Sequence, residues 1–166
     1  MAERDGTVLC PGSYDPVTNG HLDIISRSSE VFERVIVCVV NNPLRKDKTL
    51  FTAEERRAFI EEAAAHLGNV EVRVFSNLLV QFARELGAKS IVKGLRAISD
   101  FEYEFEMAQL NRKLDPGIES IYMIASPEYS FLSSTGVKEM ATFGGDVSDL
   151  VPGPVAAAMA DRLAEG

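Results

Sequence analysis

Short apolar runs and amphipathic segments alternate along the whole chain. The apolar runs predict strands at residues 7–10, 34–40, 70–75, 90–93 and 120–125. The run Val35-Ile-Val-Cys-Val-Val40 is apolar at every position, which is typical of a strand covered on both faces of its sheet. Apolar residues at helical spacing predict helices at residues 21–32, 52–67, 78–86, 100–114, 135–142 and 154–163.

Helix start and stop signals support this division. Thr52-Ala-Glu-Glu55 has the pattern of a capping box, and Gly68 and Gly87 follow the second and third predicted helices. Regular alternation of strands and helices over 166 residues predicts an α/β fold. We expect one domain, residues 1–166, built on a doubly wound, five-stranded parallel sheet with right-handed crossovers.

Polar segments follow each predicted strand, at residues 11–21, 41–50, 76–77, 94–100 and 126–135. In doubly wound sheets, ligands bind at this edge, where the strands have their carboxyl ends. The first segment ends in Gly20-His21, where a helical pattern begins. Unpaired N–H groups and the helix dipole make such a start suitable for a phosphate, and the histidine adds a donor. Taken alone, Gly20-His21 fits two interpretations equally well: this phosphate site, or a purely structural turn with a capping residue.

Basic and hydroxyl side chains gather in the other segments of the same edge. Three cations follow the second strand and two follow the fourth: Arg45, Lys46, Lys48, Lys93 and Arg96. A hydroxyl-rich run, residues 130–135, leads into a further helix start. Together these groups predict a site for a small phosphorylated ligand, a triphosphate in particular. A formal net charge of −8 argues against nucleic acid as the partner.

Several other classes of protein are disfavoured. Cys10 and Cys38 fall inside predicted buried strands without zinc or redox spacing. His21 and His66, the two histidines, are far apart in sequence, so no protein-built metal site is expected. Neither a P-loop pattern nor Gly-x-Gly-x-x-Gly occurs. No apolar stretch approaches a membrane span and the first residues lack a signal-peptide core, so we expect a cytoplasmic protein.

Four motifs in order carry a family resemblance that spans nearly the whole chain. Pro11-Gly-Ser-Tyr-Asp-Pro-Val-Thr-Asn-Gly-His21 resembles the signature of the nucleotidyltransferase superfamily, whose Thr/His-x-Gly-His is matched by Thr18-Asn-Gly-His21. The chain then resembles the bacterial phosphopantetheine adenylyltransferases in Val-Lys-Gly-Leu-Arg (92–96) with Asp-Phe-Glu-Tyr-Glu (100–104), Met-Ala-Gln-Leu-Asn (107–111) and Tyr-Ser-Phe-Leu-Ser-Ser (129–134). The resemblance implies the Rossmann-like fold of nucleotidyltransferases.

The implied reaction is transfer of AMP from ATP to 4′-phosphopantetheine, which gives dephospho-coenzyme A and pyrophosphate in coenzyme A biosynthesis. The attacking phosphate is already ionised at pH 7, so the chemistry needs alignment and charge neutralisation rather than a strong base. The resemblance also implies Mg²⁺ held mainly by the ATP phosphates and water. A homohexamer and feedback inhibition by coenzyme A are implied as well.

By this resemblance, His21 donates to the α-phosphate in the transition state and Ser13 holds the acceptor phosphate. Lys93 and Arg96 face the ATP phosphates and the adenylate, and Glu104 meets the nucleotide. Ser133, Ser134 and Thr135 contact the β- and γ-phosphates. Further substrate or ATP contacts are expected at Tyr14, Leu79, Gly94, Asn111, Tyr129, Ser130, Phe131 and Leu132.

The segment after the second predicted strand, residues 41–50, is called the basic segment here. It leaves open which cation corresponds to the family's loop lysine. The family's loop lysine aligns with Arg45 when counted from Pro43, and nearer Lys46 or Lys48 when counted from Phe51. We favour Lys46 as the catalytic cation, with Arg45 as an ATP contact. Arg45 and Lys48 are also compatible with ordinary solvated loop charges, Glu104 with a solvated helix face, and Asn111 with a contact within a helix interface.

Three rival functions remain open at this point. Sister nucleotidyltransferases, such as glycerol-phosphate cytidylyltransferases and nicotinamide-mononucleotide adenylyltransferases, share the first motif. Class I aminoacyl-tRNA synthetases share a His-x-Gly-His, but this chain has no Lys-Met-Ser-Lys-Ser segment. A catalytically silent module that senses adenylate or coenzyme A would keep the binding residues without turnover. For the subunit contact of an oligomer, the apolar residues of segment 101–107 are the candidates.

Overall fold

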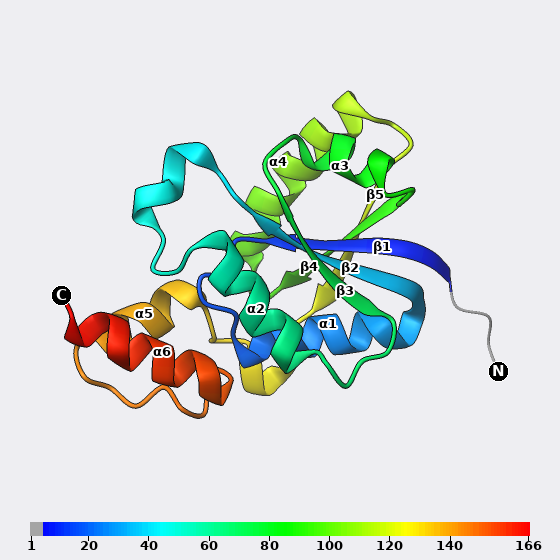
Figure 1. Cartoon of the computed structure of the whole chain (residues 1–166). Helices are drawn as coiled ribbons and strands as arrows, with labels where there is room; N and C mark the ends of the chain where they lie inside the picture. Colours follow the sequence, from blue (N-terminus) through cyan, green and yellow to red (C-terminus); the bar gives the residue numbers. More distant parts are fainter. Residues whose placement is uncertain (1–4) are drawn as a thin grey trace.

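The five predicted strands form one sheet in which every pairing is parallel. The computed structural model describes residues 5–166, and Figure 1 shows the sheet with helices on both faces. The strands are β1 (Asp5–Gly12), β2 (Phe32–Val40), β3 (Val70–Phe75), β4 (Ser90–Leu95) and β5 (Glu119–Ile124). Their order in the sheet is β3-β2-β1-β4-β5, so the predicted doubly wound α/β fold is confirmed.

Two groups of helices cover the two faces of this sheet. The helices are α1 (Asn19–Val31), α2 (Ala53–Ala63), α3 (Leu79–Glu85), α4 (Ile98–Leu114), α5 (Ser134–Thr142) and α6 (Gly153–Ala164). Residues of α1, α2, α5 and α6 pack in one buried cluster with Val8 and Cys10 of β1. The other cluster joins Leu9 to α3, beside which α4 lies (Figure 1). Adjacent strand residues thus point into opposite cores, as a two-sided apolar strand requires.

The strand order reverses at β1, which lies between β2 and β4. The chain builds β2 and β3 on one side of β1 and then crosses to β4 on the other side. Such a reversal opens a crevice at the carboxyl ends of the strands, because the two crossovers leave on opposite faces. The segments after β1 and β4 therefore meet at the edge where the sequence predicts a ligand. Among residues 5–166, no helix is both long and apolar enough for a bilayer.

Several element boundaries differ from the sequence prediction. β1 continues through Pro11-Gly12, which pair with Cys38 and Val39. α2 ends at Ala63 instead of Leu67, and turns fill the interval. α4 begins two residues early because the Asp100 carboxylate accepts the Ala97 N–H from inside the first turn. The basic segment, predicted as a loop, is a 3-10 helix, η1 (Pro43–Lys48), started by the Asn42 side chain.

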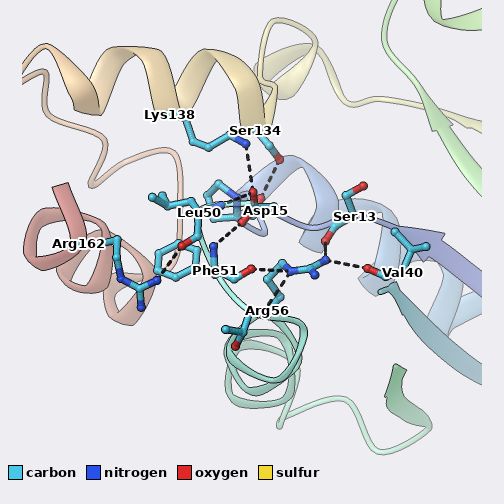
Figure 2. Close-up of polar contacts among 11 residues, drawn as sticks. Ser13, Asp15, Val40, Leu50, Phe51, Arg56, Ser134, Lys138 and Arg162 are labelled. Atoms are coloured by element: carbon cyan, nitrogen blue, oxygen red, sulfur yellow. Dashed lines mark hydrogen bonds and ion pairs between the residues drawn. The ribbon is translucent and has the colours of Figure 1, made fainter. Parts of the chain in front are cut away.

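Arg56 of α2 connects three of the segments that meet at the carboxyl edge. Its side chain is buried, with 3% exposed, and donates to the carbonyls of Ser13 (2.6 Å), Val40 (3.0 Å) and Phe51 (3.1 Å). Figure 2 shows the guanidinium between these backbones. A planar group with five donors can serve several carbonyls at once, which an ammonium cannot do with the same geometry. Arg56 therefore sets the position of the segment after β1 relative to the end of β2 and the start of α2.

We expect Arg56→Met to lower the free energy of unfolding by about 2–3 kcal/mol, because it leaves buried carbonyls without donors. Urea denaturation followed by circular dichroism measures this change. The matched control is Arg57→Met on the same helix, where the half-exposed guanidinium pairs with Glu61 at 2.8 Å. A surface pair of this kind contributes about 0.3–0.5 kcal/mol. Equal effects of the two substitutions would contradict the assigned role of Arg56.

Candidate active site

A cleft of about 820 Å³ opens at the carboxyl edge of the sheet, where β1 and β4 end. The end of β1, the start of α1, η1, the end of β4, the first turns of α4 and the start of α5 all contribute lining residues. The cleft therefore lies at the strand-order reversal, as predicted. Thirteen predicted site residues line it: Ser13, Tyr14, His21, Arg45, Lys93, Gly94, Arg96, Glu104, Tyr129, Leu132, Ser133, Ser134 and Thr135.

His21 and Thr18 form a reciprocal cap at the start of α1. The Thr18 hydroxyl accepts a hydrogen bond from the His21 backbone N–H (3.3 Å), and the Thr18 N–H donates to His21 Nδ1 (3.0 Å). Capping boxes ordinarily use Glu or Gln at this third helical position. Here the imidazole takes that part. The spacing Thr18-x-x-His21 is that of a capping box, so His21 has a capping role as well as a place at the cleft.

This cap determines where the imidazole proton lies. Because a backbone N–H can only donate, Nδ1 must be the acceptor, and the proton of the neutral ring is on Nε2. Burial, together with the positive charges of Arg96 and Lys93, lowers the His21 pKa to about 4. At pH 7 His21 is thus neutral, with its Nε2–H available as a hydrogen-bond donor.

Tyr14 supports the other side of this imidazole. The two rings meet edge to face with centroids 5.0 Å apart, and the Tyr14 hydroxyl donates to the Cys10 carbonyl at 2.8 Å. A Cβ at Gly12 would lie 3.0 Å from the Tyr14 ring, so the close approach requires glycine. Burial raises the Tyr14 pKa well above its ordinary value, so the hydroxyl stays protonated and keeps this bond.

Lys93 of β4 and Arg96, the residue after this strand, are each held by a carboxylate of α4. Lys93 Nζ lies 3.4 Å from Glu104, and Arg96 Nε lies 3.2 Å from Asp100. Arg96 also donates to the Leu132 carbonyl at 2.9 Å, which connects it to the segment before α5. Both side chains line the cleft, and these ion pairs fix their positions. Such preorganised charge lowers the cost of neutralising an anion.

η1 brings a second pair of cations to the cleft. Arg45 and Lys48 both line it. A 3-10 helix has three residues per turn, so residues three apart share a face, which explains why both reach the same cavity. The side chain of Lys46 lies outside the described part of the structure, so the preference for Lys46 stays a prediction.

The start of α5 supplies hydroxyls and a helix N-terminus to the same cleft. Ser133 is the N-cap and accepts from the Gly136 N–H at 3.0 Å. The Ser134 hydroxyl donates to the Pro16 carbonyl at 2.7 Å, which attaches α5 to the segment after β1 (Figure 2). The exposed Thr135 lines the cleft in the first turn. This arrangement suits phosphate oxygens, as the first turn of a helix commonly does.

Four predicted contacts do not line the cleft: Leu79, Asn111, Ser130 and Phe131. Leu79 packs with the core cluster on the α3 face, and Asn111 lies in the last turn of α4, well beyond Glu104. Ser130 donates to Pro127 within its own turn, and the Phe131 side chain is 72% exposed. Tyr129 and Leu132, the motif neighbours of Ser130 and Phe131, do reach the cavity. Residue spacing alone does not say which side of a turn faces the cleft.

A model of the cytidylyltransferase-like family matches residues 9–140. A phosphopantetheine adenylyltransferase of Heliobacterium modesticaldum is 52% identical over 93% of this chain and 91% of its own length. One of Rubrobacter xylanophilus is 56% identical over 87% of each chain. The chain belongs to the phosphopantetheine adenylyltransferase family.

A solved structure shares the fold of this family member at low sequence identity. It is described as a nicotinate-nucleotide adenylyltransferase of Vibrio parahaemolyticus, and it superposes with a TM-score of 0.66 over 96% of this chain and 94% of its own. The two sequences are 17% identical, so the likeness concerns the fold alone.

Sequence reasoning did not single out Asp15 and Lys138, which also line the cleft. Asp15 was inside the quoted first motif, yet a carboxylate is an unexpected neighbour for an anion. Lys138 lies one helical turn beyond Ser134, so its spacing was a usable signal: a position four residues later on a helix shares the same face.

We predict that His21 is an Nε2–H tautomer at pH 7 and titrates near pH 4. The chain has two histidines, so His66→Gln, at an exposed position, leaves a single imidazole for ¹⁵N NMR. A histidine in the unfolded chain has a pKa near 6.5, so His21 in the native state is protonated only at a lower pH. Stability from this group is complete above about pH 6.5 and decreases toward pH 4. A midpoint between pH 6 and 7 in the folded protein would contradict the prediction.

Proposed function

We propose that this chain transfers AMP from ATP to 4′-phosphopantetheine, giving dephospho-coenzyme A and pyrophosphate. The observation that carries the proposal is the neutral Nε2–H of His21 at a helix start, facing a cleft lined by Lys93, Arg96, Arg45 and Lys48. The family relationship supplies the acceptor. The names of the relatives specify phosphopantetheine, and their identity extends over most of both chains.

In this reaction, a phosphate oxygen of 4′-phosphopantetheine attacks the α-phosphorus of ATP. The bond from the α-phosphorus to the bridging oxygen breaks, and pyrophosphate leaves with that electron pair. The nucleophile is already an anion at pH 7, so no residue has to remove a proton. The remaining tasks are to align two anions and to stabilise charge on the transferring phosphoryl group.

The residues of the cleft divide these tasks between them. His21 donates from Nε2 to the α-phosphate, and because the ring is neutral, no positive charge has to be buried at this position. Ser13, exposed after β1 with its carbonyl held by Arg56, binds the acceptor phosphate. Lys93 and Arg96 attract the ATP phosphates. The first turn of α5, with Ser133, Ser134 and Thr135, binds the β- and γ-phosphates, and Glu104 meets the nucleotide.

Mg²⁺ is part of the proposal as a partner of ATP. Three carboxylates line the cleft, and each already faces a cation: Asp15 faces Lys138, Asp100 faces Arg96, and Glu104 faces Lys93. Within residues 5–166, no three His, Cys, Asp or Glu side chains gather as a metal-binding group. These paired carboxylates therefore suit a Mg²⁺ ion that is coordinated mainly by the ATP phosphates and water.

The resemblance to the family also leads us to propose a homohexamer in the cytoplasm, inhibited by coenzyme A. α4 supports the subunit contact: Phe101, Tyr103 and Phe105 are 46%, 63% and 52% exposed, and none of its residues is buried. Exposed aromatic residues in such number are typical of a protein interface. Coenzyme A would compete at the same cleft, because it carries the pantetheine and adenylate parts of the product.

The experiment that tests the function measures pyrophosphate release from ATP and Mg²⁺ with 4′-phosphopantetheine. Nicotinamide mononucleotide and glycerol 3-phosphate are run beside it. We expect turnover with phosphopantetheine alone. Loss of one transition-state donor in His21→Ala should lower kcat roughly 10²–10³-fold. His66→Ala is the matched control: this exposed histidine lies in the turn before β3, at the opposite edge of the sheet.

Two outcomes would contradict the proposal. Release with a different acceptor would assign the chain to another nucleotidyltransferase function. Tight binding of ATP without release from any acceptor would indicate a silent nucleotide sensor.

A further inference from the structure

A buried carboxylate holds the end of the basic segment from across the cleft. Asp15, with 4% of its surface exposed, accepts from the Leu50 N–H (2.8 Å) and the Phe51 N–H (2.9 Å). These amides directly follow η1 and Thr49. The two hydrogen bonds join the segment after β1 to residues that are 35 positions later in the chain. A carboxylate can accept both bonds at once, because it has two acceptor oxygens and no donor.

The same peptide pair is held from two further directions (Figure 2). Arg56 donates to the Phe51 carbonyl, and Arg162 of α6 donates to the Leu50 carbonyl at 2.7 Å. η1 itself packs little: the Leu44 side chain is 87% exposed. The position of η1, and of the cations that it carries, therefore depends on how its ends are fixed.

The negative charge of Asp15 is paired with the positive charge of Lys138. Asp15 lines a cleft whose other charged groups are arranged for an anionic ligand. Lys138 Nζ lies 3.2 Å from Asp15 Oδ2, and the lysine side chain is about one-third exposed toward the same cleft. Without this cation, a negative charge would stand beside the bound phosphates, in a partly water-excluded site where Coulomb interactions are strong.

We propose that Asp15 is a positioning residue that anchors the basic segment at Leu50-Phe51, and that Lys138 is its counter-charge, which prevents Asp15 from repelling ATP. Neither side chain needs to touch the reacting atoms. Asp15 acts through the backbone that carries Arg45 and Lys48, and Lys138 acts through Asp15. The proposal rests on the proposed function for its ligand, ATP, while the anchoring is independent of that function.

The anchoring is tested by limited trypsin digestion, with peptides ending at Arg45, Lys46 or Lys48 quantified by mass spectrometry. In Asp15→Asn, the NH₂ group of the side-chain amide takes the place of one carboxylate oxygen. Two donors, this NH₂ and a backbone N–H, then face each other and one hydrogen bond is lost. The segment then opens more often, and cleavage within it accelerates about tenfold. Lys138→Met keeps both Asp15 hydrogen bonds and leaves the cleavage rate unchanged. Unaltered cleavage in Asp15→Asn would overturn the anchoring role.

The counter-charge role is tested by a double-mutant cycle on the KM for ATP. We expect Lys138→Met to raise this KM about tenfold in the otherwise native protein, with a smaller change in kcat. In the Asp15→Asn background, the same substitution should change it less than twofold, because no carboxylate charge remains to compensate. An equal rise in both backgrounds would overturn the proposal and make Lys138 a direct ligand of ATP. Lys138→Arg should restore the native KM.

Two controls keep the outcomes separable. Lys89→Met removes an exposed lysine just before β4, at the sheet edge opposite the cleft, and should alter neither readout. If Asp15→Asn does not fold, hydrogen exchange of the Leu50 and Phe51 amides in the native protein decides the anchoring. Slow exchange supports it, and exchange as fast as in η1 overturns it. Absence of turnover in the native protein would refute the proposed function but leave the digestion result valid.

Discussion

The hydrogen bond from the Thr18 N–H to His21 Nδ1 is the contact on which the chemistry of the cleft depends. It satisfies a backbone donor at the start of α1 and, in the same step, places the only proton of the neutral ring on Nε2. Burial and the charges of Arg96 and Lys93 then keep the ring from taking up a second proton near pH 7. Helix capping, tautomer and electrostatic role are thus consequences of one short motif.

The surrounding fold converts this local geometry into a site for two anionic substrates. The reversal of strand order at β1 brings the ends of β1 and β4 to one crevice, and α5 adds a second helix start. Cations and carboxylates that line the cleft form ion pairs, as Lys93 and Glu104 illustrate. Arg56 and Asp15, both buried, hold the backbone of Ser13 and the end of the segment that carries Arg45 and Lys48. Arg56 and Asp15 thus position the backbone, and the side chains that face the cleft bind the substrates.

Much of this arrangement could be predicted from the sequence, because it depends on patterns that local physics controls. Fully apolar strands and capped helices predicted the α/β fold, and the edge rule for parallel sheets predicted where Lys93 and Arg96 would meet His21. Spacing could not show which members of a loop motif face the cleft, so Ser130 and Phe131 were assigned with neighbours that do. The roles of Asp15 and Lys138 depend on a contact between residues 123 positions apart, which no local pattern in the chain records.

The central claim is that His21 acts as a neutral hydrogen-bond donor and not as a base. The most direct measurement compares kcat for pyrophosphate release in His21→Gln and His21→Ala with 4′-phosphopantetheine as acceptor. A glutamine amide can donate from near the Nε2 position but cannot accept a proton at pH 7. The account predicts that His21→Gln keeps at least about tenfold more activity than His21→Ala, since one donor contributes roughly 10²–10³-fold. Equal, near-complete loss in both variants would contradict it.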